Sequence, residues 1–205
     1  IFVEGVQKPV FKNRTPGVVI EDAKAPSQGH LARTLNPTEM LVQWQSAQID
    51  DNQEVQWSLS PDMTNISSAN ATSTTFGAHD LCGGPANKQG FIDPGYFNSA
   101  VITGLVPGVT IAFYRFGSAT NGYSPVYRFR AAFPADPDTK THVVLTADLG
   151  VTMPDGTKYH WEEPDAFKTV QHLLHRVETT DAHLALHVGD IAYSTGYLGK
   201  WDSFM

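Results

Sequence analysis

Apolar and polar side chains alternate along much of the first 132 residues of the chain. Alternation with a period of two is the pattern of half-buried strands, and turn-forming residues separate the apolar stretches. The predicted strands are residues 39–45, 54–59, 97–103, 111–116 and 123–131. Short strands with regular turn signals are typical of a β-sandwich. We therefore predict a β-sandwich over residues 29–132, behind an N-terminal extension of residues 1–28 with short strands near 1–3 and 17–21.

One stretch of this region resembles the corner of a fibronectin type III sandwich. Residues 105–110 read Leu-Val-Pro-Gly-Val-Thr, and an alternating aromatic strand follows. In such a corner a tyrosine near the strand start is tied back to the preceding turn. Tyr114 and Phe116 are therefore expected on the inner face. The Ser-, Thr- and Asn-rich stretch 64–75 is expected to be a loop or a weak edge strand.

The hydrophobic pattern changes after residues 133–139, which are rich in Pro and Asp and are predicted to be a linker. The run 143–145 is continuously apolar, as expected for a strand covered on both faces. Phe167, Val170, Leu174 and Val177 then mark one face of a helix that follows Pro164. A strand at 183–188 completes a βαβ unit with parallel strands, and 196–204 begins another helix. Residues 140–205 are thus predicted to be an incomplete α/β domain.

Both predicted parallel strands end in an aspartate beside a glycine. Asp148 follows the first strand and precedes Gly150, while Asp190 follows Gly189 at the end of the second. Open α/β sheets place ligand groups at this edge, so the two carboxylates are expected to point at one site. Carboxylates suit a hard metal ion. Tyr193, three residues after Asp190, offers a phenol beside them.

Composition narrows the function classes. The chain has 205 residues, 41% of them hydrophobic, and a formal net charge of -7, which argues against binding to a nucleic-acid backbone. No apolar run is long enough to span a bilayer. The chain begins at Ile1 without signal-peptide features, so we expect it to be processed or a fragment. Its one cysteine, Cys82, permits no disulfide within these residues.

Three N-glycosylation sequons begin at Asn13, Asn65 and Asn70. They favour a secreted, extracellular glycoprotein. The alternative is that all of them are unused.

The motifs together resemble a known family. Ala147-Asp-Leu-Gly150 followed by Gly189-Asp-Ile-Ala-Tyr193 is similar to the first two metal motifs of the calcineurin-like metallophosphoesterases, and the tyrosine is specific to purple acid phosphatases. Plant-type members carry a fibronectin-like domain ahead of the catalytic domain. The stretches 80–86, 93–96, 196–198 and 201–204 resemble the long, plant-type branch, often described as nucleotide pyrophosphatase- or phosphodiesterase-like. The resemblance covers roughly residues 20–205.

The resemblance implies a role for each matching residue. Asp148 would bind a ferric ion, Asp190 would bridge it to a divalent ion (Zn, Mn or Fe), and Tyr193 would bind iron as a purple phenolate. A metal-bound hydroxide would then attack phosphate esters or nucleotides at phosphorus. The family's later motifs, an Asn next to a His and three further His, do not occur in these residues. We therefore expect this chain to be inactive and the full gene product to be an acid phosphatase. Ala147, in place of a common glycine, is a mild change.

Other interpretations stay open. Asp148 and Asp190 could cap turns or helices, and Tyr193 could be a core residue, as in a non-purple metallophosphoesterase. The chain could also be an extracellular β-sandwich binding module with a vestigial α/β tail. We expect His172 and His175 on the surface, and His183 and His187 as packed or hydrogen-bonded strand residues; His160 could face the site. The sequence leaves the second metal, the substrate and the oligomeric state open, a homodimer included.

Overall fold

A computed structural model describes residues 25–134, 136–151, 166–180 and 182–204. These residues form two compact units, one built from 25–75 and 95–140 and the other from 76–94 and 141–204. The predicted strands near 1–3 and 17–21, the sequon at Asn13, the loop residue His160 and Pro164 lie outside the described residues.

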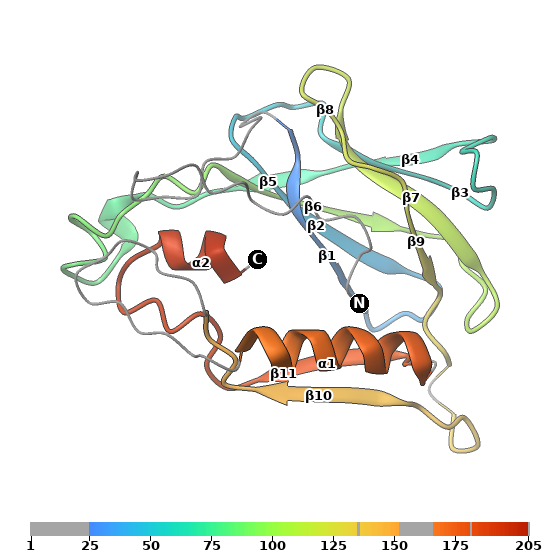
Figure 1. The fold of residues 1–205 in the computed structure, drawn as a ribbon. Helices are drawn as coiled ribbons and strands as arrows, with labels where there is room; N and C mark the ends of the chain where they lie inside the picture. Colours follow the sequence, from blue (N-terminus) through green and yellow to red (C-terminus); the bar gives the residue numbers. More distant parts are fainter. Residues whose placement is uncertain (1–24, 135, 152–165, 181, 205) are drawn as a thin grey trace. The chain divides into compact units, whose positions relative to one another are not determined.

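The first unit is a sandwich of two antiparallel sheets, as predicted (Figure 1). One sheet has the order β1-β2-β6-β5; the other has the order β4-β3-β7-β8, with β9 also paired to β7. Its strands are β1 (Ser27–Ala32), β2 (Met40–Ser46), β3 (Glu54–Ser58), β4 (Ser67–Asn70), β5 (Thr72–Thr74), β6 (Tyr96–Ile102), β7 (Ile111–Ser118), β8 (Gly122–Tyr123) and β9 (Tyr127–Arg130). This order of strands in two sheets is that of the fibronectin and immunoglobulin sandwiches.

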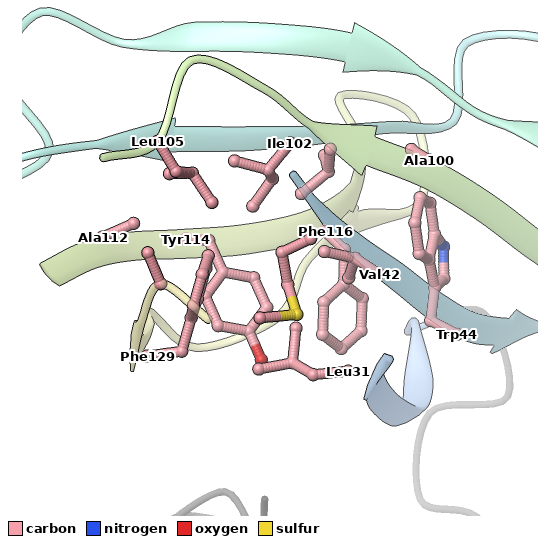
Figure 2. Packing of buried hydrophobic residues seen from close by; sticks show 13 residues of the cluster. Leu31, Val42, Trp44, Ala100, Ile102, Leu105, Ala112, Tyr114, Phe116 and Phe129 are labelled. Carbon is pink, nitrogen blue, oxygen red and sulfur yellow. The ribbon is translucent and has the colours of Figure 1, made fainter. Parts of the chain in front are cut away.

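The core of the sandwich lies between the inner faces of the two sheets. Alternate residues of β2 and β7 are buried, among them Val42, Trp44, Tyr114 and Phe116. Trp44 and Phe116 stack across the core with ring centroids 5.4 Å apart, and Figure 2 shows the two aromatic side chains lying near each other in the cluster. The expectation that Tyr114 and Phe116 face inward is therefore confirmed.

The corner before β7 is fastened differently from the expected one. The hydroxyl of Tyr114 is buried and has no hydrogen-bond partner among the described residues; Figure 2 shows it beside Leu31. Instead, Thr110 Oγ1 accepts a 2.8 Å hydrogen bond from the amide of Val106. The amide of Gly108, whose φ is 69°, donates to the carbonyl of Ala132 at 2.9 Å. A threonine and the backbone thus close the turn, and the expected tyrosine tie is wrong.

Two differences from the predicted strands appear, and one open alternative is decided. Strand β1 was not predicted, because only Leu31 in it is buried and its hydrophobic signal is weak. The closing strand expected at 123–131 is broken at Pro125 into β8 and β9, since proline cannot donate to a ladder. The stretch 64–75, expected to be a loop or a weak edge strand, contains two short edge strands, β4 and β5, which belong to different sheets. The edge-strand alternative is therefore confirmed.

The second unit contains the predicted βαβ unit, and helix α1 packs against β10 (Figure 1). Its elements are β10 (Val143–Ala147), α1 (Ala166–Thr179), β11 (Leu184–Val188) and α2 (Gly199–Phe204). Strands β10 and β11 are parallel, with Val143 opposite Leu184 and Ala147 opposite Val188. Both strands therefore end at the same edge, as expected for a crossover connection.

Two details of this unit differ from expectation. Leu173, not Leu174, lies on the buried face of α1: Leu173 is 7% exposed and Leu174 is 39% exposed. Val170 and Val177 are partly buried, as predicted, so the correction concerns Leu174. The two-stranded sheet was expected to be covered on both faces, yet Leu145 is 63% and Leu186 42% exposed. Within the described residues, one face of this sheet is open.

Residues 76–94 lie between β5 and β6 in sequence but belong to the second unit. They contain a short 3-10 helix, Ala78–Asp80. The amide of Gly77, the residue before this helix, donates a 2.7 Å hydrogen bond to Asp80 Oδ2. The predicted domain of residues 29–132 did not anticipate this excursion. None of the helices in the described part of the chain combines the length and apolar character needed to cross a bilayer.

Candidate metal site at the end of the parallel strands

Asp148 and Asp190 come together at the edge where β10 and β11 end. The last paired residues are Ala147 and Val188, so Asp148 directly follows β10, and Asp190 follows β11 after Gly189. Asp148 Oδ1 accepts a 3.0 Å hydrogen bond from the backbone amide of Asp190. A second bond joins the loops: the amide of Gly150 donates to the carbonyl of Ile191 at 2.7 Å. The prediction that parallel strands bring these two residues to one edge is confirmed.

Gly189 makes this approach sterically feasible. A Cβ atom at Gly189 would lie 2.6 Å from Asp148 Oδ1, closer than real carbon–oxygen contacts allow. Its φ of 89° is also a conformation that residues with a side chain rarely adopt. The glycine in Gly189-Asp190 is therefore required by the aspartate of the neighbouring strand.

Two of the predicted ligands have left-handed backbone conformations. The φ angle is 49° at Asp148 and 48° at Tyr193. Aspartate visits this region more readily than most residues, whereas a bulky tyrosine there is an outlier. Such outliers persist only where the surroundings hold them, and they cluster at functional sites. Gln28, Met63 and Asn65 of the sandwich have similar φ angles, so the left-handed backbone supports a site at this edge only together with the paired aspartates.

His187 supports the second aspartate from within β11. Its Nδ1 lies 2.9 Å from Thr146 Oγ1, and its Nε2 lies 2.9 Å from the carbonyl oxygen of Asp190. Both ring nitrogens are thus engaged, and the ring meets Phe204 edge-on at 6.1 Å between centroids. The expectation of a hydrogen-bonded strand histidine is confirmed. The sequence did not reveal that this residue holds the main chain of Asp190.

Four further histidines of the described residues can be placed. His183 stacks on His142 at the beginning of the two strands, with ring centroids 5.2 Å apart. His172 and His175 are exposed on α1, as predicted. Within the described residues, no group of three or more His, Cys, Asp and Glu side chains is arranged to hold a metal ion.

Tyr193 lies in the loop that follows Asp190, and its side chain is half-buried. Its carbonyl oxygen lies 3.5 Å from Nζ of Lys200, a lysine that is 0% exposed. A buried ammonium group requires polar partners, so Lys200 is a structural part of this loop. Nothing in the sequence pattern distinguishes Lys200 from a surface lysine at the start of a helix, and it was missed.

The donor set suits a hard cation. Two carboxylates and a phenol supply oxygen ligands only, the type preferred by ferric, manganese and magnesium ions. Asp148 Oδ1 accepts one hydrogen bond, which leaves its second oxygen and remaining lone pairs available. The described residues therefore fit part of a metal centre in the chemistry of their donors.

Three other predicted positions can be placed. Asn65 and Asn70 are exposed. Cys82 is exposed and unpaired.

Comparison with known proteins identifies the family. The protein-family model of the N-terminal domain of purple acid phosphatases matches residues 26–131. Two Arabidopsis thaliana proteins, named probable inactive purple acid phosphatases 24 and 1, are 30% and 31% identical over 211 and 213 residues. Those alignments cover 100% of this chain but 34% of each relative.

A solved structure agrees with these relatives. The purple acid phosphatase PPD1 from yellow lupin (Lupinus luteus) seeds matches with a TM-score of 0.76 and 30% identity, over 88% of this chain and 32% of that one. The chain thus spans about a third of the length of the relatives that it matches. Because the family model covers more than half of the chain, the chain belongs to the purple acid phosphatase family.

Proposed function

We propose that this chain is part of a secreted phosphoesterase with a dinuclear Fe(III)–M(II) site, M being Zn, Mn or Fe. One observation carries the proposal: the Asp148 carboxylate accepts a hydrogen bond from the amide of Asp190, which follows the neighbouring strand. Asp148 itself has a left-handed backbone, with φ of 49°. A plain turn cap has no need of a second acidic residue at the same edge. Family membership and the match of all three ligand positions to the family's motifs support it.

In this proposal each residue has a distinct role. Asp148 and Tyr193 would hold the ferric ion, and Asp190 would supply an oxygen ligand to both ions. His187 orients Asp190 by bonding its carbonyl oxygen, and Gly189 keeps the space for the Asp148 carboxylate. A tripositive ion favours the deprotonated form of a phenol, so Tyr193 would bind it through its phenolate oxygen. When bound, the two ions supply a hydroxide and polarise the phosphate ester.

The motif match assigns three ligand positions to this chain, and Asp190 is the only one of the three that would serve the second ion. We therefore infer that these 205 residues are inactive by themselves. The proposal assigns phosphatase activity to the gene product that contains them. Substrates would be phosphate monoesters, or nucleotides cleaved at a pyrophosphate or diester bond.

The test compares two proteins under the same conditions. The gene product and this chain are each loaded with iron and zinc and assayed with 4-nitrophenyl phosphate, its bis-ester and ATP. We expect hydrolysis by the gene product alone, and the preferred substrate defines the class. Turnover by the isolated chain would overturn the assignment of the missing ligands. Absence of turnover in the metal-loaded gene product would instead support a member without phosphatase activity, as the names of the two Arabidopsis relatives state for those proteins.

An extracellular binding module with a vestigial α/β tail remains the alternative function. It predicts no iron–phenolate absorption, because a binding module has no need of a metal at the strand ends. Secretion and glycosylation are proposed on the exposure of Asn65 and Asn70. Treatment of the secreted gene product with a peptide N-glycosidase should lower its mass, and the shift should be smaller in Asn65→Gln and Asn70→Gln variants.

A further inference from the structure

Residues 83–92 lie directly against the loop that carries Tyr193. The contact is closest at Gly90, which is buried: a Cβ atom there would lie 2.0 Å from the carbonyl oxygen of Gly196. The amide of Leu198 donates a 2.9 Å hydrogen bond to the carbonyl of Gly90. The two backbones therefore touch at Gly90 and Gly196 without room for any side chain.

The contact continues on both sides of Gly90. A Cβ atom at Gly196 would lie 2.8 Å from Cγ of Pro85, and one at Gly199 would lie 3.1 Å from Cδ1 of Ile92. The segment thus follows the loop from Gly196 to the start of α2.

Residues 83–92 form a well-fastened turn in their own right. The carbonyl of Pro85 accepts the amides of Lys88 and Gly90 at 2.9 and 3.0 Å. The carbonyl of Gly83 accepts the amide of Asn87 at 3.0 Å. A turn with this many internal hydrogen bonds can act as a fixed support for whatever packs on it.

The loop that it supports is conformationally unfavourable. The φ angles of Tyr193, Thr195 and Gly196 are 48°, 50° and 89°, and the first two residues carry side chains that disfavour such values. Left-handed residues of this kind persist when neighbouring structure over-determines them. The neighbours here are the 83–92 turn and the buried Lys200, whose Nζ lies 3.5 Å from the Tyr193 carbonyl.

We propose that Gly90 is a positioning residue for Tyr193. The turn 83–92, which lies between β5 and β6 in sequence, holds the Tyr193–Gly196 loop in the conformation needed for metal binding. This inference rests on the proposed function, because it assigns Tyr193 as an iron ligand. It also explains why residues 76–94 belong to the second unit although they lie between two strands of the sandwich in sequence.

Gly90→Ala in the gene product that contains this chain tests the proposal. The added methyl group would clash with Gly196 and push the loop away. Gly83→Ala is the matched control, because a Cβ atom there meets nothing within 4 Å in the same turn. The readouts are hydrogen exchange of the Leu198 amide in the metal-free protein and the iron–phenolate absorption band in the iron-loaded protein.

We expect Gly90→Ala to accelerate exchange of the Leu198 amide by about tenfold or more. We also expect the absorption band to shift or to lose intensity at equal iron content. Gly83→Ala should leave both unchanged. A normal band in Gly90→Ala overturns the positioning role, whether or not exchange accelerates. A wild-type protein that binds iron without any such band overturns the ligand role of Tyr193, and with it the proposed function.

Ile92→Ala provides a second variant if Gly90→Ala does not fold. Ile92 is 44% exposed, so its truncation removes the contact with Gly199 without opening the core. A change of the band in the same direction, smaller in size, supports the proposal, and an unchanged band overturns it.

Discussion

Asp148 Oδ1 accepts a hydrogen bond from the backbone amide of Asp190, a residue 42 positions further along the chain, at 3.0 Å. This bond fastens one predicted ligand to the main chain of the other. It explains why a glycine precedes Asp190, since a side chain at Gly189 would occupy the place of the Asp148 carboxylate. Protein contacts alone thus hold the two acidic residues next to each other.

Replacement of Asp148 separates its structural role from its proposed ligand role. Asp148→Asn keeps a side-chain oxygen for the Asp190 amide and tolerates the φ of 49°. We expect the metal-free gene product to unfold in urea at nearly the wild-type midpoint, while its iron content falls. Asp148→Ala loses the hydrogen bond and places alanine in the left-handed region, so it should destabilise the protein by about 2 kcal/mol. Full iron content in Asp148→Asn would contradict the ligand role.

Gly189→Ala should disturb the site by two effects, backbone strain at φ of 89° and a clash with Asp148 Oδ1. Gly122→Ala is the control for strain alone, because Gly122 has φ of 86° and open space around its Cβ position. Both should lower the free energy of unfolding by about 1 kcal/mol or more. Only Gly189→Ala should reduce the iron bound per protein, as measured by metal analysis. Equal iron content in the two variants would show that the Gly189 contact does not shape the site.

The corner of the sandwich offers a test of how it is fastened. Because the Tyr114 hydroxyl is buried without a partner in the described structure, Tyr114→Phe should be neutral or stabilise by about 1 kcal/mol. Thr110→Val removes the acceptor for the Val106 amide and should destabilise by about 1 kcal/mol. Urea unfolding followed by tryptophan fluorescence measures both. A larger loss of stability in Tyr114→Phe than in Thr110→Val would instead support the hydrogen bond from Tyr114 to the turn that the sequence suggested.

Alkaline pH should weaken the sandwich through Tyr123. Burial, followed by the hydrogen bond and charge of Glu54, raises the pKa of Tyr123 to about 12 from 10.0. Above pH 10 the unfolded chain releases this proton while the folded chain keeps it, so stability falls as pH rises from about 10 to 12. The urea midpoint of Tyr123→Phe should therefore decline less between pH 9 and pH 11 than that of the wild type. An equal decline in both proteins would show that Tyr123 does not cause the loss of stability at alkaline pH.

Local pattern was enough to predict the features that depend on sequence spacing. The period-two alternation in 39–45 and 54–59 located β2 and β3, because one face of each strand is buried. The apolar runs that end in Asp148 and Asp190 predicted parallel strands with a shared edge, since a crossover connection leaves few alternatives. The positions of two of the three proposed ligands followed from those strand ends alone.

The features that were missed arise from contacts distant in sequence. Gly90 resembles an ordinary loop glycine until Gly196 is seen against it, and Lys200 resembles a surface lysine until its burial is known. Leu174 was expected on the buried face of α1 in place of Leu173, because the two are adjacent and equally apolar and periodicity could not decide which one packs inward. His187 was correctly expected to be hydrogen-bonded, but its bond to the Asp190 carbonyl depends on the loop conformation.

Visible absorption of the iron-loaded gene product, wild type against Tyr193→Phe, tests the central claim most directly. We predict a phenolate-to-iron band in the wild type that is lost in Tyr193→Phe, while Tyr197→Phe, four residues further along the same loop, retains it. A wild-type protein that binds iron without colour, or a band that survives in Tyr193→Phe, would contradict the assignment of Asp148, Asp190 and Tyr193 to one metal centre.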